Sequence, residues 1–297
     1  MPRFSINEMT TYHWSFLEDV TAYRANGVNQ IGVWRRKFTD FGEERGIELL
    51  RESGLAVSSF SSAGGFTGAD GHTFREAVDD AHDALRQAAD MRAACLVVVG
   101  GARAGHTIRH AQSLLRDALL ELGDAAARLN VSVALQAVHR RPVERWSFLT
   151  SLKTTLDLLV SCDHPHVGLV FDFFHFWREP DLFEVIPQVI PWIKIAALCD
   201  ARAPAECDDD RCLPGEGLIP LGDIIAALEA GGYGGVYDVQ LLSEKCWSAD
   251  YPTLLKGCRE ALSRIAPQTF PFRAQSPESE PSRLIDPARA PLAAPPP

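Results

Sequence analysis

Short apolar runs alternate with longer amphipathic stretches over the first 265 residues of the chain. The short runs have the length of buried strands, and the longer stretches repeat apolar residues at i, i+3 and i+4, which is typical of helices with one buried face. The pattern predicts eight strands, at Arg3–Ile6, Gln30–Trp34, Ala56–Phe60, Cys95–Val99, Val131–Gln136, Val167–Phe171, Ile193–Leu198 and Val236–Leu241. It predicts eight helices, at Ser15–Ala25, Phe41–Glu52, Thr73–Ala89, Thr107–Leu129, Ser147–Val160, Asp181–Ile190, Leu221–Ala230 and Tyr251–Ile265.

Glycine follows several of the predicted helices, at Gly27, Gly54 and the pair Gly231-Gly232. A glycine just past a helix adopts the left-handed conformation that ends it, so these positions mark the return to the next strand. Eight βα units match the usual length of roughly 250 residues for a (β/α)8 barrel. We therefore predict an α/β fold, a (β/α)8 TIM barrel spanning residues 1–265. A doubly wound open sheet is the alternative, but no G-x-G-x-x-G follows an early strand.

The character of the chain changes at Ala266, where prolines begin to interrupt a polar, alanine-rich segment. Proline blocks helices and removes a backbone donor, and this segment offers little to bury. We predict that residues 266–297 form a disordered Pro/Ala-rich tail without a catalytic role.

Composition disfavours several classes of partner. A net charge of −10 disfavours nucleic acid, because phosphate binding needs a basic surface. No apolar run approaches the roughly 20 residues of a membrane span, and no charged-then-apolar leader opens the chain. The seven cysteines are odd in number and lack C-x-x-C spacing, which indicates reduced thiols. We therefore expect a cytoplasmic protein with a small-molecule partner, no nucleic acid and no membrane; a homo-oligomer is possible, although nothing specifies an interface.

Candidate chemistry gathers where the predicted strands end, which is the working face of a barrel of this kind. The sixth strand opens into Asp172 and His175, a carboxylate and an imidazole three residues apart. The alternative is a purely structural role, in which Asp172 caps the next helix and His175 is a half-buried histidine. Other strand ends supply further candidate catalytic residues, His139 and Asp200, and candidate substrate-binding residues, Trp34, Arg35, Gln136, Trp177, Arg202 and Gln240.

Gln136 and Gln240 are polar side chains inside apolar strands. Burying an amide costs a few kcal/mol, on the order of 1–3, unless it is hydrogen-bonded. They are therefore predicted either to bind substrate or to pair with neighbouring strand ends. Trp34 and Trp177 are candidate apolar platforms for a sugar ring, although core packing is the alternative for any aromatic residue.

These segments resemble the xylose isomerase-like TIM barrel superfamily, the sugar phosphate isomerase/epimerase group. The motifs that carry the resemblance are the D-x-x-H pair at Asp172 and His175 and the G-E-G-x-I-P-L segment from Gly215 to Leu221. The resemblance implies a divalent metal ion (Mn, Mg or Zn) held by a Glu, an Asp, a His and a Glu at the ends of strands five to eight. Matched position by position, these ligands fall on Gln136, Asp172, Ala197 and Gln240, so Asp172 is at most the one metal ligand retained.

This departure from the family pattern bears on mechanism. A hard cation loses affinity when carboxylates are replaced by neutral amides, and an amide has no usable proton equilibrium near neutral pH. We therefore expect no tightly bound metal. The resemblance implies a sugar or sugar-phosphate isomerase or epimerase, with His175 or His139 moving the proton, Asp172 or Asp200 orienting the imidazole, and Arg35 or Arg202 holding an oxyanion. Two alternatives stay open: a metal-independent lyase or hydrolase on the same barrel, and a non-catalytic sugar-binding pseudoenzyme.

Overall fold

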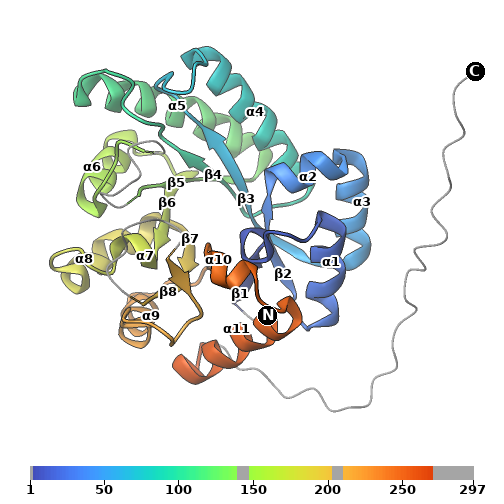
Figure 1. The fold of residues 1–297 in the computed structure, drawn as a ribbon. Coiled ribbons are helices and arrows are strands. Elements are labelled where there is room, and N and C mark those ends of the chain that lie inside the picture. Colours follow the sequence, from blue (N-terminus) through green and yellow to red (C-terminus); the bar gives the residue numbers. More distant parts are fainter. Residues whose placement is uncertain (1–2, 139–146, 203–209, 270–297) are drawn as a thin grey trace, which may run out of the picture.

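Eight parallel strands close into a barrel. The structure is a computed structural model that describes residues 3–138, 147–202 and 210–269. Around the barrel the strands follow the order β1, β10, β7, β6, β5, β4, β3, β2, and every neighbouring pair is parallel. Helices cover the outside (Figure 1), which confirms the predicted (β/α)8 barrel. The strands are β1 (Phe4–Asn7), β2 (Gln30–Trp34), β3 (Ala56–Gly64), β4 (Cys95–Val99), β5 (Ser132–Gln136), β6 (Val167–Asp172), β7 (Ile193–Leu198) and β10 (Tyr237–Val239).

The predicted helices keep most of their bounds, with two main differences; the short helices Phe173–Phe176 and Glu244–Trp247 and two 3-10 helices were not predicted. The predicted helix Phe41–Glu52 is preceded by a separate helix that starts directly after β2, and the predicted helix at Ser147 begins five residues later, because Ser151 is its N-cap and accepts a hydrogen bond from Thr154 N. The helices are α1 (Phe16–Ala25), α2 (Arg35–Phe41), α3 (Glu43–Ser53), α4 (Phe74–Asp90), α5 (Ile108–Leu129), α6 (Leu152–Cys162), α7 (Phe173–Phe176), α8 (Leu182–Val189), α9 (Leu221–Ala230), α10 (Glu244–Trp247), α11 (Tyr251–Ile265) and two 3-10 helices, Glu8–Thr11 and Ile190–Trp192. Within the described residues no helix is both long enough and apolar enough to cross a membrane.

Side-chain caps and glycines set where these helices begin and end. Ser15 and Thr73 each close a capping box with a glutamate three residues on, which fixes the starts of α1 and α4. Gly27, Gly54 and Gly232 have φ angles of 71°, 69° and 91°. The left-handed backbone predicted for the glycines after these helices is therefore present. The last described helix, α11, ends at Ile265, and most of the predicted tail, from residue 270 on, lies outside the described residues.

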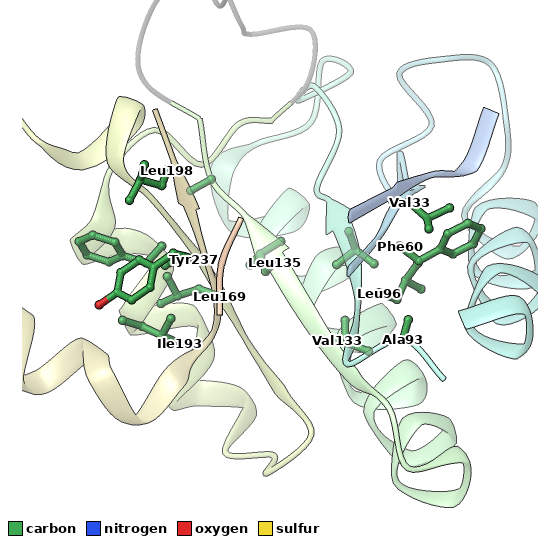
Figure 2. Close-up of a cluster of buried hydrophobic side chains, with 14 of the residues drawn as sticks. Val33, Phe60, Ala93, Leu96, Val133, Leu135, Leu169, Ile193, Leu198 and Tyr237 are labelled. Carbon is green, nitrogen blue, oxygen red and sulfur yellow. The ribbon is translucent and has the colours of Figure 1, made fainter. Parts of the chain in front are cut away.

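The strands are buried on both faces. On the inner face, small side chains fill the barrel, from Cys95, Val97, Ala134, Val170, Ile195 and Ala197. Alternate residues on the same strands point outward and pack under the helices. Figure 2 shows part of this outer layer, with Leu96, Leu135 and Leu169 on neighbouring strands. Two apolar faces explain why the strands read as continuous apolar runs rather than as alternating ones.

A buried carboxylate lies inside the barrel next to the seam between its first and last strands. Asp238 of β10 accepts hydrogen bonds from Ser5 Oγ at 2.5 Å, Asn7 Nδ2 at 2.9 Å and Ser59 Oγ at 3.3 Å. Gln240, just past the same strand, donates to Asp238 Oδ2 at 3.2 Å. Burial raises the pKa of Asp238, and these hydrogen bonds partly oppose the shift. Residues of β1, β3 and β10 are thereby tied to one group.

A short hairpin follows β7 and adds a pair of strands to the carboxyl-terminal face. The strands β8 (Asp200–Ala201) and β9 (Arg211–Cys212) are antiparallel, and Asp200 pairs with Cys212. Strands of two residues carry no periodicity, so the apolar pattern did not predict them. The hairpin brings Arg211 to the ends of the barrel strands.

Candidate functional site

Four side chains meet at the carboxyl ends of β5 and β6 and on β9: Gln136, Asp172, His175 and Arg211. Gln136 Nε2 donates to Asp172 Oδ2 at 3.0 Å. Arg211 donates to the same carboxylate from both ends of its guanidinium, Nη1 to Oδ1 at 3.3 Å and Nη2 to Oδ2 at 3.1 Å. His175 Nε2 lies 3.4 Å from Arg211 Nη2 and 3.7 Å from Asp172 Oδ2. We call these four residues the Asp172 cluster.

The local sequence explains how Asp172 and His175 are placed. Asp172 ends β6 and is the N-cap of α7, because its Oδ1 accepts from Phe174 N at 2.9 Å. The capping role weighed from the sequence is therefore confirmed, and it coexists with the ion pair to Arg211. His175 lies on the single turn of α7, so the D-x-x-H spacing carries its imidazole back toward the carboxylate.

Burial distinguishes the members of the Asp172 cluster. The side chains of Asp172, His175 and Arg211 are 0%, 1% and 1% exposed. Gln136 is half-buried. A ligand that reached this cluster in the described structure would therefore meet Gln136 first.

Two further candidates from the sequence analysis bind elsewhere. Asp200 accepts four backbone hydrogen bonds, at 2.8–3.0 Å, from Ala201, Gly215, Gly217 and Ile219. Its carboxylate thereby organises the G-E-G-x-I-P-L segment, and a Cβ on Gly217 would lie only 2.3 Å from Asp200 Oδ1. Arg202 is exposed and forms an ion pair with Glu216. This geometry favours a structural role for Asp200; its predicted catalytic role is untested.

The predicted substrate-binding residues near β2 lie on a separate part of the same face. Trp34 lines a cavity of about 450 Å³ together with Tyr12, and the two rings are 5.5 Å apart. Tyr12 also stacks on Trp247 at 4.5 Å. Arg35 makes two contacts of 2.7 Å to Asp80 of α4. Neither this cavity nor a second one of about 400 Å³ beside Arg35 and Ser61 is lined by the Asp172 cluster.

The remaining predicted residues are placed as follows. Trp177 caps α7 and is half-buried, with Arg178 over its ring at 5.5 Å. Gln240 is turned to Asp238, which fits the strand-end pairing considered from the sequence. His139 lies outside the described residues.

A second buried polar cluster lies beside Trp34 and was not predicted from the sequence. Glu8 Oε2 accepts from Trp34 N at 2.6 Å, whereas its Oε1 has no hydrogen-bond partner among the described residues. Lys37 and Asp19 form a buried ion pair at 2.6 Å. Burial, followed by the negative charge of Asp19, raises the pKa of Glu8 well above its usual value. Burial also raises the pKa of Asp19, to about 6, against the opposing effect of Lys37.

Among the described residues, the donor set does not fit a bound divalent cation. Of the four positions that the family resemblance assigns to ligands, Gln136 and Gln240 are amides engaged by carboxylates, and Ala197 is a buried methyl group on the inner face. Residues 3–138, 147–202 and 210–269 contain no group of three or more His, Cys, Asp or Glu side chains arranged to hold a metal ion. Cys199, two residues beyond Ala197, is buried, and burial raises the pKa of its thiol.

Arg211 is the member of the Asp172 cluster that the sequence did not predict. It follows a run of aspartates, a pattern that predicts an exposed loop, yet its guanidinium is buried against Asp172, 39 positions earlier in the chain. No local signal in the sequence marks it as a partner of Asp172.

Comparisons with known proteins agree with the fold. Residues 20–263 match the family model of the xylose isomerase-like TIM barrel. Inosose isomerase from Bacillus velezensis is 26% identical over 158 residues, which are 52% of this chain and 55% of that protein. The chain thus spans about half the length of the curated relatives it matches, among them inosose isomerase from Bacillus licheniformis at 24% identity.

Solved structures match over nearly the whole barrel. Protein SMc04130 from Sinorhizobium meliloti 1021 has a TM-score of 0.81 at 26% identity and covers 89% of this chain and 98% of its own. The IOLI protein, solved with a binding zinc atom, has a TM-score of 0.79 at 19% identity and covers 91% of this chain and 100% of its own. At 19% identity, the similarity to the IOLI protein concerns the fold alone.

Proposed function

Because the chain belongs to the xylose isomerase-like TIM barrel family, we propose that it is an isomerase or epimerase of a small polyhydroxylated carbonyl compound, a sugar, sugar phosphate or cyclic polyol ketone. The observation that carries this proposal is the Asp172 cluster, which places an imidazole, a carboxylate and a guanidinium together at the carboxyl ends of the barrel strands. Active sites of TIM barrels lie at this face. The inosose isomerases among the relatives support the class of substrate.

Within the cluster, His175 is the group we propose for proton transfer. Gln136 has no usable proton equilibrium, Arg211 stays protonated in proteins, and an ionised Asp172 only accepts hydrogen bonds. An imidazole exchanges its proton near neutral pH. Arg211 would stabilise the negative charge that develops on a carbonyl oxygen when the adjacent carbon loses its proton.

The aromatic side chains around Trp34 support a carbohydrate ligand. Tyr12 and Trp34 line the cavity of about 450 Å³ with their rings 5.5 Å apart, and Arg36 lies over the Trp34 ring at 5.9 Å. Trp247 stacks on Tyr12. An aromatic face packs against the apolar carbon face of a sugar ring, while nearby polar groups bind its hydroxyls. We propose this cavity as a carbohydrate-binding subsite on the same face of the barrel, separate from the Asp172 cluster.

Solvent exchange at carbon tests the proposal. The chain would be incubated in D2O with keto-sugars, sugar phosphates and inososes, and NMR would follow the loss of C–H signals next to the carbonyl. We expect exchange or interconversion with the natural chain, loss of at least about 100-fold in His175→Gln, and no change in His110→Gln, an exposed histidine on α5. Full activity of a folded His175→Gln variant would remove the assignment, and elimination products would favour the lyase alternative.

A non-catalytic sugar-binding role is the second candidate. It is favoured by the full engagement of Asp172 and by the burial of His175, which leave the described cluster closed. Calorimetric titration with the same compounds distinguishes the two functions. Binding without exchange or product formation supports the pseudoenzyme, and turnover excludes it.

A further inference from the structure

The carboxylate of Asp172 has no room for a metal ion beside the groups that already bind it. Its Oδ1 receives Phe174 N at 2.9 Å and Arg211 Nη1 at 3.3 Å. Its Oδ2 receives Gln136 Nε2 at 3.0 Å and Arg211 Nη2 at 3.1 Å. An ionised carboxylate offers about four lone-pair positions, so these four donors use its capacity to accept.

The environment of Arg211 is that of a buried, compensated cation. Its guanidinium lies 4.7 Å from the centre of the Phe174 ring, and Nη1 lies 3.8 Å from Cys199 Sγ. A guanidinium has no lone pair to offer, so its contact of 3.4 Å with His175 uses Nε2 of the imidazole as the acceptor. The positive charge is thus presented to the carboxylate and to the imidazole at once, as a cation bound by an Asp and a His would be.

We propose that the guanidinium of Arg211 is the permanent cation of this site, in place of the divalent ion implied by the family resemblance. Arg211 then supplies the positive charge that pairs with the Asp172 carboxylate and that an oxyanion would meet, and the site needs no divalent metal. The substitutions are mutually consistent, because a fixed guanidinium takes up one carboxylate and tolerates neutral amides at Gln136 and Gln240, where a metal ion would need charged oxygen ligands. This inference concerns the charge of the site and holds whether or not the chain turns over a sugar.

Metal content and metal-induced stabilisation test whether the site does without a divalent metal ion. The natural chain would be purified from cells grown with added Mn and Zn and analysed by elemental mass spectrometry. We expect far less than one divalent ion per chain and no rise in melting temperature with Mn²⁺ or Zn²⁺ at about 1 mM, a concentration that stabilises any protein with a micromolar site. A stoichiometric divalent ion that is lost in Asp172→Asn would overturn the proposal.

A second pair of variants tests whether Arg211 excludes the metal. Gln136→Glu restores a carboxylate next to Asp172 while Arg211 remains, and the double variant Gln136→Glu, Arg211→Ala removes the guanidinium as well. We expect a Mn²⁺-dependent or Zn²⁺-dependent rise in melting temperature in the double variant and none in Gln136→Glu alone. Equal stabilisation of both variants would show that Arg211 does not occupy the cation's place.

Chemical rescue tests whether the guanidinium of Arg211 is the cation of the site. Arg211→Ala leaves Asp172 buried without its cation, and we expect its melting temperature to fall by about 6–10 °C. Guanidinium chloride at about 20 mM, well below denaturing concentrations, should restore part of this loss, whereas equal concentrations of sodium chloride and urea should not. Arg202→Ala, which removes an exposed arginine from the same region, is the matched control. Arg211→Lys keeps the positive charge but lacks the planar guanidinium that donates to both carboxylate oxygens. Its melting temperature is expected to fall less than that of Arg211→Ala.

The outcomes separate the inference from a purely structural role. Rescue confined to Arg211→Ala supports a guanidinium-shaped cation site. Guanidinium that stabilises Arg202→Ala equally, or an Arg211→Ala variant as stable as Arg202→Ala, would refute the proposal. Because these readouts use metal content and stability, a failure of the sugar isomerase assay leaves them unchanged.

Discussion

Replacing Asp200 by asparagine tests whether this carboxylate is structural. Each of its oxygens accepts two backbone N–H groups: Oδ1 from Ala201 and Ile219, and Oδ2 from Gly215 and Gly217. An asparagine amide has one oxygen and one NH2 group. In either orientation of the amide, two of the four N–H donors therefore face a donor and lose their acceptor.

The size of the effect follows from these four bonds. A hydrogen bond to a charged group contributes about 1.5–3 kcal/mol, so the loss of two corresponds to about 3–6 kcal/mol of the free energy of unfolding. At about 2 °C per kcal/mol for a domain of this size, the melting temperature of Asp200→Asn should fall by about 6–12 °C. Asp223→Asn, an exposed change in the first turn of α9, is the matched control and should cost less than about 1 kcal/mol.

Urea denaturation and thermal unfolding measure the loss of stability, and ligand binding or turnover is measured at low temperature, where both variants are folded. We expect Asp200→Asn to be much less stable than Asp223→Asn and to keep most of its function per folded molecule. The reasoning is refuted by an Asp200→Asn variant of natural stability whose activity is abolished, because that result would return Asp200 to the catalytic machinery.

Three further predictions concern residues of β2 and of the segment between β1 and β2. Burial raises the pKa of Asp19 to about 6 and that of Glu8 well above its usual value, so the folded chain holds these protons more tightly than the unfolded chain. The stability that they contribute is present at about pH 4 and falls as the pH rises through their pKa values in the folded chain. Glu8→Gln replaces Glu8 by a group that cannot ionise, so its stability relative to the natural chain should rise as the pH rises above about 4 in urea titrations, and a constant difference would contradict the assignment. A Cβ on Gly32 would lie 2.7 Å from Asp238 Oδ2, so Gly32→Ala should lower the free energy of unfolding by about 1–3 kcal/mol, and unchanged stability in urea would show that the surrounding side chains move to make room for the methyl group. Trp34→Ala should weaken carbohydrate binding about 10-fold by calorimetry, and unchanged affinity would place the ligand elsewhere.

The sequence predicted the barrel because its strands carry a strong local signal. The bounds of β2, β4 and β7 agree with the apolar runs, since burial on both faces makes each run continuous. The helix α2 was missed because it starts at Arg35, directly after β2, where two arginines interrupt the apolar periodicity. The short strands β8 and β9 were missed because two residues are too few for any period.

The sequence predicted only the part of the candidate site that depends on local spacing. Asp172 and His175 are close in sequence, so their spacing on α7 predicted their proximity. The partner of Asp172 depends on long-range pairing: β9 places Arg211 against a carboxylate 39 positions away. The sequence also predicted a catalytic role for Asp200, whose carboxylate accepts hydrogen bonds from the backbone. A polar residue at a strand end looks the same in the sequence whether it binds a substrate or the backbone.

The hydrogen bonds of Asp238 have a consequence for how the barrel assembles. Ser5 and Asn7 reach this carboxylate across 233 and 231 positions of the chain. Contacts between such distant positions carry a large cost in loop-closure entropy and belong to the slow steps of folding. Until they form, β1 and β10 each keep an open strand edge, and an open edge is a template for pairing with another chain. The hydrogen bonds of the buried carboxylate help to keep the barrel closed, so the edges of β1 and β10 are rarely exposed. Asp238 therefore also protects the chain from aggregation.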